Sequence, residues 1–467
     1  MINLKNIKNQ KHIDIKIVQV LFYTFPLSFI IGNLILSAHL LLFIIISSIC
    51  IVKHKINIKF SKLNFLLLAF FLYLFLSTAI QFPDIYDTWI DIRNINYKTL
   101  TLENHPVLKS FLLIRFLILI ILLDALFFSK ILSLKKFFYF TLLCTSFVSI
   151  DIIIQYIYGY DLFGYKSLGE RNPGPFGDEI VAGSYLQRFA FISFFSILLM
   201  NFKNKKINKI LLFFIITTHV TAIFLSGNRM PMILFLFGFF LMTLFVKNFR
   251  IVTWVSLASF VLIFFLIYNN NKNVHDHYSS FLYQINIFKY INAQKIEKEK
   301  SVTVEDANKK FSNNLKSNLL SGGHSSIYRT SIEMWKQQPL FGYGLKSFRF
   351  KCWELLIINP EGKDLICSTH SHNYYLEILS ETGIIGLIFM IIFFLFLIKD
   401  SFYFVRKNNR KINAEIIFML PIMISIFLEI WPIKSSGSFF TTSNATFLWL
   451  MVGILLSANV KNLNNKL

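Results

Sequence analysis

The chain changes character within the stretch Cys367-Ser-Thr-His-Ser-His-Asn-Tyr-Tyr-Leu-Glu-Ile-Leu-Ser-Glu-Thr-Gly-Ile-Ile-Gly-Leu387, where a polar segment gives way to an apolar one. From Leu376 to Ile398 most residues are Leu, Ile, Phe and Met, which at about 1.5 Å per residue is long enough to cross a bilayer. His370, His372 and Asn373 therefore lie at the mouth of a predicted membrane helix. Titratable side chains at such a position cost free energy to desolvate, which makes this stretch a candidate functional site.

The composition is that of an integral membrane protein. Of 467 residues, 55% are hydrophobic and 54 are Phe, and the mean hydropathy is +0.57, far from the balance of a soluble domain. A formal charge of +22 would indicate nucleic-acid binding only if it formed a basic face on a folded domain. Most Lys and Arg lie instead in short gaps between apolar runs. We therefore interpret the charge as a topology signal and expect no nucleic-acid partner.

The apolar runs predict an all-α polytopic fold with about twelve transmembrane helices. The gaps on one side of these runs are basic, at 53–62, 130–136, 203–209, 247–250 and 406–411. Because positive loops stay in the cytoplasm, both termini are expected there. The predicted crossings are two short ones within 17–52, then 63–82, 108–129, 137–158, 183–201, 208–225, 231–246, 251–268, 374–398, 414–431 and 443–459.

The opposite gaps face outward, and the longest of them lies between the ninth and tenth predicted helices. At roughly 100 residues it is too long for a structureless connection inside a compact protein. We expect three parts: transmembrane helices 1–9 in residues 1–268, one large periplasmic segment in 269–371, and helices 10–12 in 372–467.

Cysteine usage is sparse. Cys50 and Cys144 lie in apolar runs, where they are expected to be small packing residues. Cys352 and Cys367 lie in the large outer segment, where an oxidising compartment permits a disulfide. The sequence leaves open whether they pair.

Arginines mark the outward-facing turns. Arg229 lies in Leu225-Ser-Gly-Asn-Arg-Met-Pro231, a turn too short to form a domain, and its guanidinium can hold a phosphate through a forked pair of hydrogen bonds. The alternative is an arginine that reaches out to lipid headgroups. Arg171 and Arg188 flank a loop rich in Pro and Gly and leave the same two interpretations open. Arginines and histidines on one side of the membrane indicate an anionic, lipid-linked substrate.

Histidine is the side-chain type whose ordinary pKa of about 6.5 suits a base at neutral pH. If a helix included both His370 and His372, they would point about 200° apart, so one alone could face a given pocket. The sequence does not choose between them. A structural role and a His-x-His metal pair are the alternatives, and no nearby Asp, Glu or Cys completes a convincing set of metal ligands.

Several polar side chains fall inside apolar runs. Asp151 and Gln155 share a helical face and are expected either to line a substrate cavity or, preferably, to brace Arg115, because charges within membranes tend to pair. Glu377 is a candidate for orienting the histidine. Glu381 has no predicted role.

Taken together in this order, the motifs resemble the O-antigen ligase and O-antigen polymerase family. The likeness covers about residues 171–400, its earliest part being the looser Arg171-Asn-Pro-Gly174. The motifs that carry it are Ser226-Gly-Asn-Arg229, the segment from Arg329 through Trp335 to Pro339-Leu-Phe-Gly-Tyr-Gly344, His372-Asn-Tyr-Tyr-Leu-Glu377 and Glu381-Thr-Gly-Ile-Ile-Gly386.

The resemblance implies a GT-C-like glycosyltransferase of the bacterial inner membrane with a periplasmic active site. It would move a glycan from undecaprenyl pyrophosphate to an acceptor hydroxyl, here expected on lipid A core, without cofactor or metal. His372 is then the catalytic histidine and Arg229 the arginine that engages the pyrophosphate. The residues expected to bind substrate are Arg171, Arg188, Asn373 and Arg329.

The same family includes polymerases that extend the repeat unit and transferases that glycosylate proteins. A ligase is expected because one dominant outer segment leads into the His-Asn motif, an argument by analogy. A transporter of lipid-linked sugars is the alternative from another class. It would predict inverted repeats and broken helices with charges at mid-membrane depth, whereas the sequence shows no repeat and its charges concentrate at the outer rim.

Overall fold

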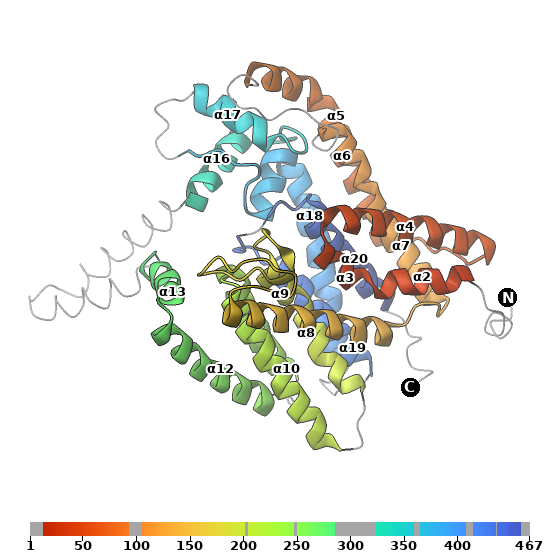
Figure 1. Ribbon diagram of the computed structural model, residues 1–467. Helices are drawn as coiled ribbons and strands as arrows, with labels where there is room; N and C mark the ends of the chain where they lie inside the picture. The colour runs from red at the N-terminus through yellow and green to blue at the C-terminus, as the bar shows by residue number, and fades with distance from the viewer. Residues whose placement is uncertain are drawn as a thin grey trace, which may run out of the picture.

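The computed structural model describes residues 13–92, 105–200, 204–246, 250–284, 323–358, 365–407, 414–435 and 437–458. Helices fill most of these ranges, and none of them contains a strand (Figure 1). An isolated antiparallel bridge joins Tyr160 to Lys166. The predicted all-α fold is therefore confirmed.

In the described ranges, eight helical stretches are long and apolar enough to cross a membrane. The pair α2 (Ile13–Tyr23) and α3 (Phe25–Ile31), bent by 56°, makes a ninth candidate, and α11 (Arg229–Phe245), α19 (Ala414–Glu429) and α20 (Thr442–Ala458) are shorter apolar helices. Each predicted crossing coincides with one of these elements, which confirms a polytopic membrane protein. The eight stretches are formed by α4 (Asn33–Lys53), α5 (Lys62–Ile92), α6 (Pro106–Leu112) continued by α7 (Ile114–Phe128), α8 (Leu134–Tyr158), α9 (Ala182–Leu199), α10 (Lys205–Leu225), α12 (Arg250–Asn270) and α18 (Tyr374–Lys407).

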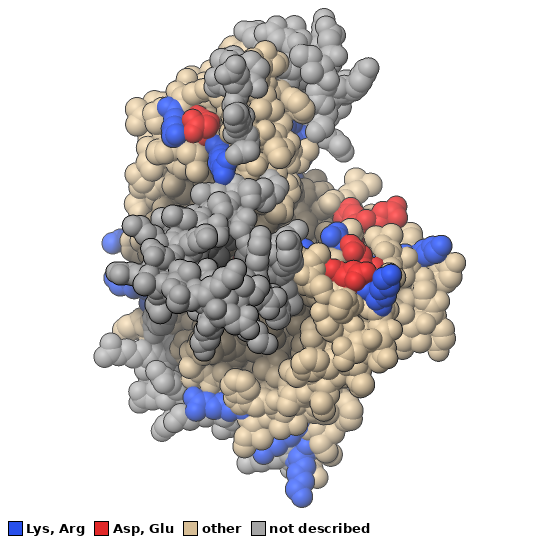
Figure 2. All heavy atoms as spheres, turned by 90° about the vertical axis from the view of Figure 1, so that its left-hand side faces the viewer, with Lys and Arg blue, Asp and Glu red and all other residues tan. Residues whose placement is uncertain are grey.

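Helix α9 lies at the centre of this bundle. Its span is 89% buried, against 22% for α12 at the periphery, and α8, α10, α11 and α19 pack against it. Phe189, Phe191 and Phe194 of α9 are fully enclosed, and Phe194 stacks on Phe239 of α11 with ring centroids 5.7 Å apart. The described surface in Figure 2 carries few charged side chains, as expected for a bundle surrounded by lipid.

The described part of the predicted outer segment contains three further helices: α13 (Lys272–Gln284), α16 (Gly323–Gln337) and α17 (Phe348–Ile358). Met334 of α16 and Phe348 and Leu355 of α17 form a small core of their own. Cys352 and Cys367 are joined by a disulfide beside this core, with Cα atoms 5.4 Å apart. The pairing that the sequence left open thus fastens α17 to the segment that leads into the His-Asn motif.

Two of the glycine motifs interlock through their backbones. Helix α18 breaks at Gly383, where φ is +67°, and the segment 339–344 fills the break. Ile384 donates its N–H to Pro339 at 2.9 Å, and Gly344 donates to Glu381 at 2.8 Å. No Cβ fits between the two backbones at Gly383 or at Gly342. The predicted outer segment is therefore held against α18 at Gly383, at the far end of the helical residues that follow His372 and Asn373.

Gly342→Ala should destabilise the protein by roughly 2–4 kcal/mol, because it combines left-handed backbone strain with overpacking. Gly342 has φ +66°, and an added Cβ would lie 2.5 Å from the Glu381 backbone. The matched control is Gly159→Ala, where φ is +81° and nothing lies within 4 Å, so that strain alone, about 1 kcal/mol, applies. Thermal unfolding in detergent measures both variants. Equal losses would contradict the interlock.

Candidate functional site

The His-Asn motif forms the turn that starts α18. His372 adopts a left-handed backbone with φ +52°. Asn373 then caps the helix, since its Oδ1 accepts from the N–H groups of Tyr375 at 3.0 Å and Leu376 at 3.2 Å. Its amide also donates to the carbonyl oxygen of Pro432 at 2.7 Å. Asn373 therefore fixes the turn that carries His372 against the loop between α19 and α20.

Three imidazoles meet at this turn. The ring centroid of His372 lies 4.1 Å from that of His370 and 4.8 Å from that of His324, the second residue of α16. Because α18 begins only at Tyr374, the two motif histidines are not on one helix and their rings do not diverge. The Oγ of Ser368 lies 3.3 Å from Nε2 of His372. Sequence reasoning missed His324, which is distant along the chain and belongs to no motif.

A buried carboxylate lies beneath this turn. Glu429 accepts from Nε of Arg188 at 3.0 Å, Nη2 of Arg188 at 2.7 Å, the hydroxyl of Tyr374 at 2.6 Å and Nζ of Lys434 at 2.7 Å. Arg188 also donates to Asn444 at 2.6 Å. The guanidinium predicted to bind substrate is thus engaged in a buried ion pair that joins α9 to α19.

Lys434 places a second cation on the same carboxylate. Its Nζ lies 5.6 Å from the ring centroid of Tyr374, and its carbonyl oxygen lies 3.4 Å from the Asn373 amide. Burial lowers the pKa of Lys434 to about 8, although the charge of Glu429 opposes the shift. Two cations on one anion leave positive charge next to the His-Asn turn.

The two glutamates of α18 secure neighbouring loops. Glu377 accepts from the N–H of Phe439 at 2.6 Å and from the hydroxyl of Ser438, which holds the α19–α20 loop. Glu381 accepts from the N–H groups of Lys346 at 2.8 Å and Phe348 at 3.4 Å, at the start of α17. The role of Glu377 in orienting the histidine stays a prediction, whereas its bonds to this loop are observed.

A second polar cluster, the arginine recess, is formed by Glu170, Arg171, Arg229 and His277. Gly227, at φ +69°, lies against it, and a Cβ there would lie 2.7 Å from Cγ of Arg171. Asn228 fixes the same turn, because its Oδ1 accepts from Gly183 at 2.9 Å. The Ser-Gly-Asn-Arg motif therefore brings Arg229 to the loop that carries Arg171.

His277 of α13 links the members of the recess. Nη2 of Arg229 donates to the His277 carbonyl oxygen at 2.6 Å, and Glu170 lies 3.3 Å from Nδ1 of His277 and 3.4 Å from Nε of Arg171. Burial and the charge of Arg229 lower the pKa of His277. Nε2 of His277 donates to the carbonyl oxygen of Gly227 at 3.0 Å. No sequence motif marked His277.

Helix α9 connects the histidine turn to the arginine recess. Gly183 in its first turn bonds to the Arg229 turn, and Arg188, about 7.5 Å further along the axis, bonds to Glu429 beneath the His-Asn turn. The two clusters therefore lie around the same end of α9.

Arg329 is half-buried on α16, the helix that also carries His324.

Asp151 and Gln155 do not make the predicted brace for Arg115 in the hydrogen bonds of the described residues. Asp151 accepts from the N–H of Leu162 at 2.9 Å, and Gln155 accepts from that of Gly174 at 2.7 Å. Both side chains hold the loop that precedes α9.

One group in the described ranges has the proximity that metal ligation requires: Asp14, Cys50 and His54 bring ligand atoms within 4.8 Å of one another. Asp14 already lies 2.7 Å from Nε2 of His54 and 3.5 Å from Nζ of Lys53. An ion pair and a hydrogen bond of Asp14 therefore join α2 to α4, away from the His-Asn turn.

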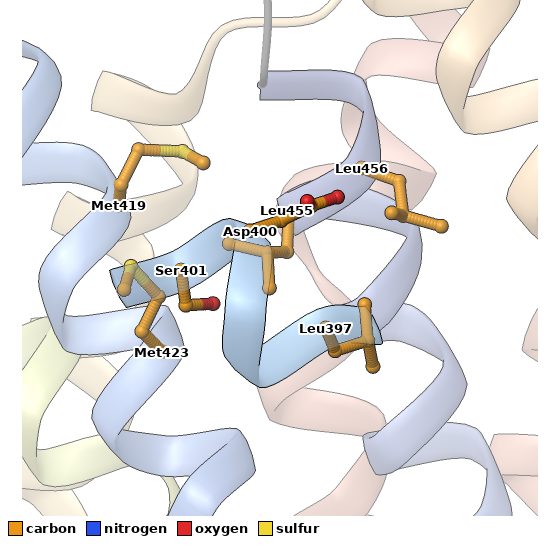
Figure 3. Close-up of a pocket in the computed structure, with 7 residues that line it drawn as sticks. All are labelled: Leu397, Asp400, Ser401, Met419, Met423, Leu455 and Leu456. Carbon is orange, nitrogen blue, oxygen red and sulfur yellow. The ribbon is translucent and has the colours of Figure 1, made fainter. Parts of the chain in front are cut away.

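The crevice in Figure 3 lies at the opposite end of α18 from His372, between α18, α19 and α20. Its cavity volume of about 10 Å³ is that of roughly one water molecule. Its seven lining residues include one acid and no histidine or arginine: Leu397, Asp400, Ser401, Met419, Met423, Leu455 and Leu456. This crevice is not a candidate site for a glycan.

Residues 210–391 match the protein family described as O-Antigen ligase. This match confirms the resemblance, and it includes Arg229, His277, Arg329 and His372. No curated protein matches the chain. Arg171, Arg188 and the α19–α20 loop lie outside the matched residues, although the structure brings them to the same end of α9.

Arg188→Ala should reduce stability by roughly 3–5 kcal/mol, the usual cost of breaking a buried ion pair. Thermal unfolding of the purified protein measures this loss, and Arg171→Ala, whose side chain is 38% exposed, serves as the arginine control. A stable but inactive Arg188→Ala would instead indicate a ligand contact and would contradict the anchoring role.

Proposed function

From the O-antigen ligase family match in residues 210–391, we propose that this protein transfers a glycan from an undecaprenyl-pyrophosphate-linked donor to an acceptor hydroxyl. The observation that carries the proposal is the arrangement around α9: a histidine turn and an arginine recess at one end of the bundle. A base and a phosphate-binding cation are the two groups that this reaction needs.

The transfer is a displacement at the anomeric carbon. The acceptor oxygen forms a bond to that carbon while the bond to the pyrophosphate oxygen breaks, and the pyrophosphate takes the electron pair. His372 orients the acceptor hydroxyl and removes its proton. Arg229, with Arg171 beside it, stabilises the negative charge that grows on the departing pyrophosphate.

The remaining candidates act at different distances from the reaction. Asn373 positions His372 through the cap and the bond to Pro432. Arg188 anchors Glu429 below the turn. Arg329 is proposed to contact the glycan or its phosphate from α16. No residue in this scheme requires a metal ion or cofactor.

Topology follows from the basic gaps: we place the protein in the bacterial inner membrane, with cytoplasmic termini and the site facing the periplasm. The proposed acceptor is lipid A core. Polymerisation of the repeat unit is the second candidate, because the matching family supports either role. In this proposed topology, residues 1–268 and 372–467 form the membrane-spanning parts, and residues 269–371 form the periplasmic segment between them.

His372→Ala and Arg229→Ala should each lower transfer at least 100-fold, because each removes a group that acts in the transition state. The assay incubates purified protein with lipid-pyrophosphate-linked glycan and lipid A core in the presence of a chelator. Arg250→Ala is the matched control, since Arg250 begins α12 and donates to the Thr243 carbonyl oxygen.

The products separate the candidate functions. Glycosylated lipid A core supports a ligase, and a longer glycan ladder without it supports a polymerase. Passage of lipid-linked sugar across vesicles with neither product would indicate a transporter and refute the enzyme proposal. Normal activity in both variants would refute the assigned site.

Transfer should also fall above about pH 8, where Lys434 loses its proton and positive charge at the turn declines. Lys434→Arg should retain activity to higher pH, because a guanidinium stays protonated. The pKa of Lys434 is depressed from 10.5 to about 8 in the folded state. Between about pH 8 and 10.5 the Lys434 side chain binds more protons in the unfolded chain than in the folded protein. Through this group, the folded state therefore becomes more stable as the pH rises.

The alkaline loss therefore does not arise from unfolding at Lys434. Thermal unfolding measured at each pH provides the check. If Lys434→Arg loses transfer activity over the same alkaline pH range as the unsubstituted protein, deprotonation of Lys434 is not the cause of the loss.

A further inference from the structure

The loop that follows α8 folds back along α8 instead of leading away from it. The N–H of Leu162 bonds to Asp151, and the ring of Phe163 lies against that of Phe147 with centroids 6.1 Å apart. Figure 1 shows this segment, in yellow, beside α8 and α9. Both partners belong to the membrane-spanning part of α8.

These partners set the depth of the loop. Asp151 lies about 10 Å, and Phe147 about 16 Å, below the outer end of α8 at Tyr158 along the helix axis. Helical side chains also lean toward the N-terminus, which here is the inner end. Lys135 and Lys136 mark that inner end, and the apolar helix beyond them is only about as long as the hydrocarbon is thick. The tip at Leu162 and Phe163 therefore lies below the membrane surface.

Irregular backbone within a membrane must have its polar groups satisfied, and hydrogen bonds engage several N–H and C=O groups of this loop, although Oδ2 of Asp151 and of Asp161 is buried without a hydrogen bond to the described residues. Asp161 Oδ1 accepts from the N–H groups of Phe163 at 3.0 Å and Tyr165 at 2.6 Å. Tyr165 in turn accepts at its carbonyl oxygen from Asp161 at 3.0 Å and from the Gln155 amide at 3.1 Å. Asp151, Gln155 and Asp161 thus all form hydrogen bonds with backbone groups of this loop.

The tip of the loop is apolar and exposed, whereas the exposed Lys166 and Glu170 lie further along it. Leu162 is 59% exposed and Phe163 is 63% exposed. The stripe Leu143, Ile150 and Ile157 on α8, also at least half exposed, continues toward this tip, because Phe147 is one helical turn from Leu143 and Ile150. The loop therefore extends a surface that already faces lipid.

We propose that residues 159–173 form a re-entrant loop whose Leu162-Phe163 tip lies in the hydrocarbon of the outer leaflet. The same loop carries Arg171 into the arginine recess, and Asn172 ties its end to Leu225 of α10 at 2.7 Å. The loop would then hold one arginine of the recess beside the bilayer, as suits the phosphate of a lipid rather than a soluble anion. The identity of that lipid rests on the proposed function, whereas the depth of the loop does not.

Spin labelling measures the depth directly. A nitroxide is attached at Phe163→Cys, and separately at Leu162→Cys, in full-length protein with Cys50 and Cys144 replaced by alanine, reconstituted in bilayers. Collision with oxygen, which concentrates in hydrocarbon, is compared with collision with a water-soluble nickel complex. Leu143→Cys is the lipid-facing control, and Glu179→Cys, at an exposed position nearer α9, is the water-facing control.

Both tip labels should resemble Leu143→Cys, with oxygen collisions exceeding nickel collisions several-fold. Labels that behave like Glu179→Cys, or that are shielded from both reagents, would overturn the proposal and indicate water or a protein partner at the tip. Because the measurement does not involve transfer, the re-entrant loop can be established even if no glycan product is found. Conversely, glycan transfer with a water-exposed tip would refute the loop and leave the enzyme intact.

Discussion

The end of the bundle that carries the His-Asn turn depends on the carboxylate of Glu429. A buried charge at a membrane helix end is expensive unless its partners come with it, and here the partners come from three elements: Arg188 of α9, Tyr374 of α18 and Lys434 of the α19–α20 loop. Tyr374 directly follows the His-Asn turn. The ion pair therefore sets the position of the proposed base relative to the central helix, although none of its members needs to touch substrate.

The motifs that carry the family resemblance divide into two kinds on physical grounds. The glycines of segments 339–344 and 381–386 allow two backbones to meet at a break in α18, where a Cβ would collide. Such motifs hold the outer segment in register. The motifs around Arg229 and His372 also contain turns built by Gly227 and Asn373, but each turn delivers a titratable or charged side chain to the end of α9. The glycine motifs thus serve packing, whereas the motifs around Arg229 and His372 present the side chains that the proposed reaction uses.

The membrane helices could be predicted from the sequence because hydropathy is a local property, and the spans follow it closely. The site could be predicted only where a motif marked it. Arg188 and Arg229 look alike in sequence, and what separates them is Glu429, which lies far along the chain and meets Arg188 only after folding. His324 and His277 were missed for the same reason. Asp151 and Gln155 were expected to brace Arg115, but their partner is a loop backbone, which carries no side-chain signal.

The placement of the two clusters also bears on mechanism. In a displacement, the nucleophile and the leaving group occupy different sides of the reacting carbon, so a base and a phosphate-binding cation should not share one pocket wall. The His372 turn is attached to α9 through Arg188, whereas the Arg229 turn is attached through Gly183. A buried helix that is 89% enclosed is a rigid spacer between them. Such a rigid separation would favour the proposed transfer, since an orientation fixed by the fold need not be acquired each time the substrates bind.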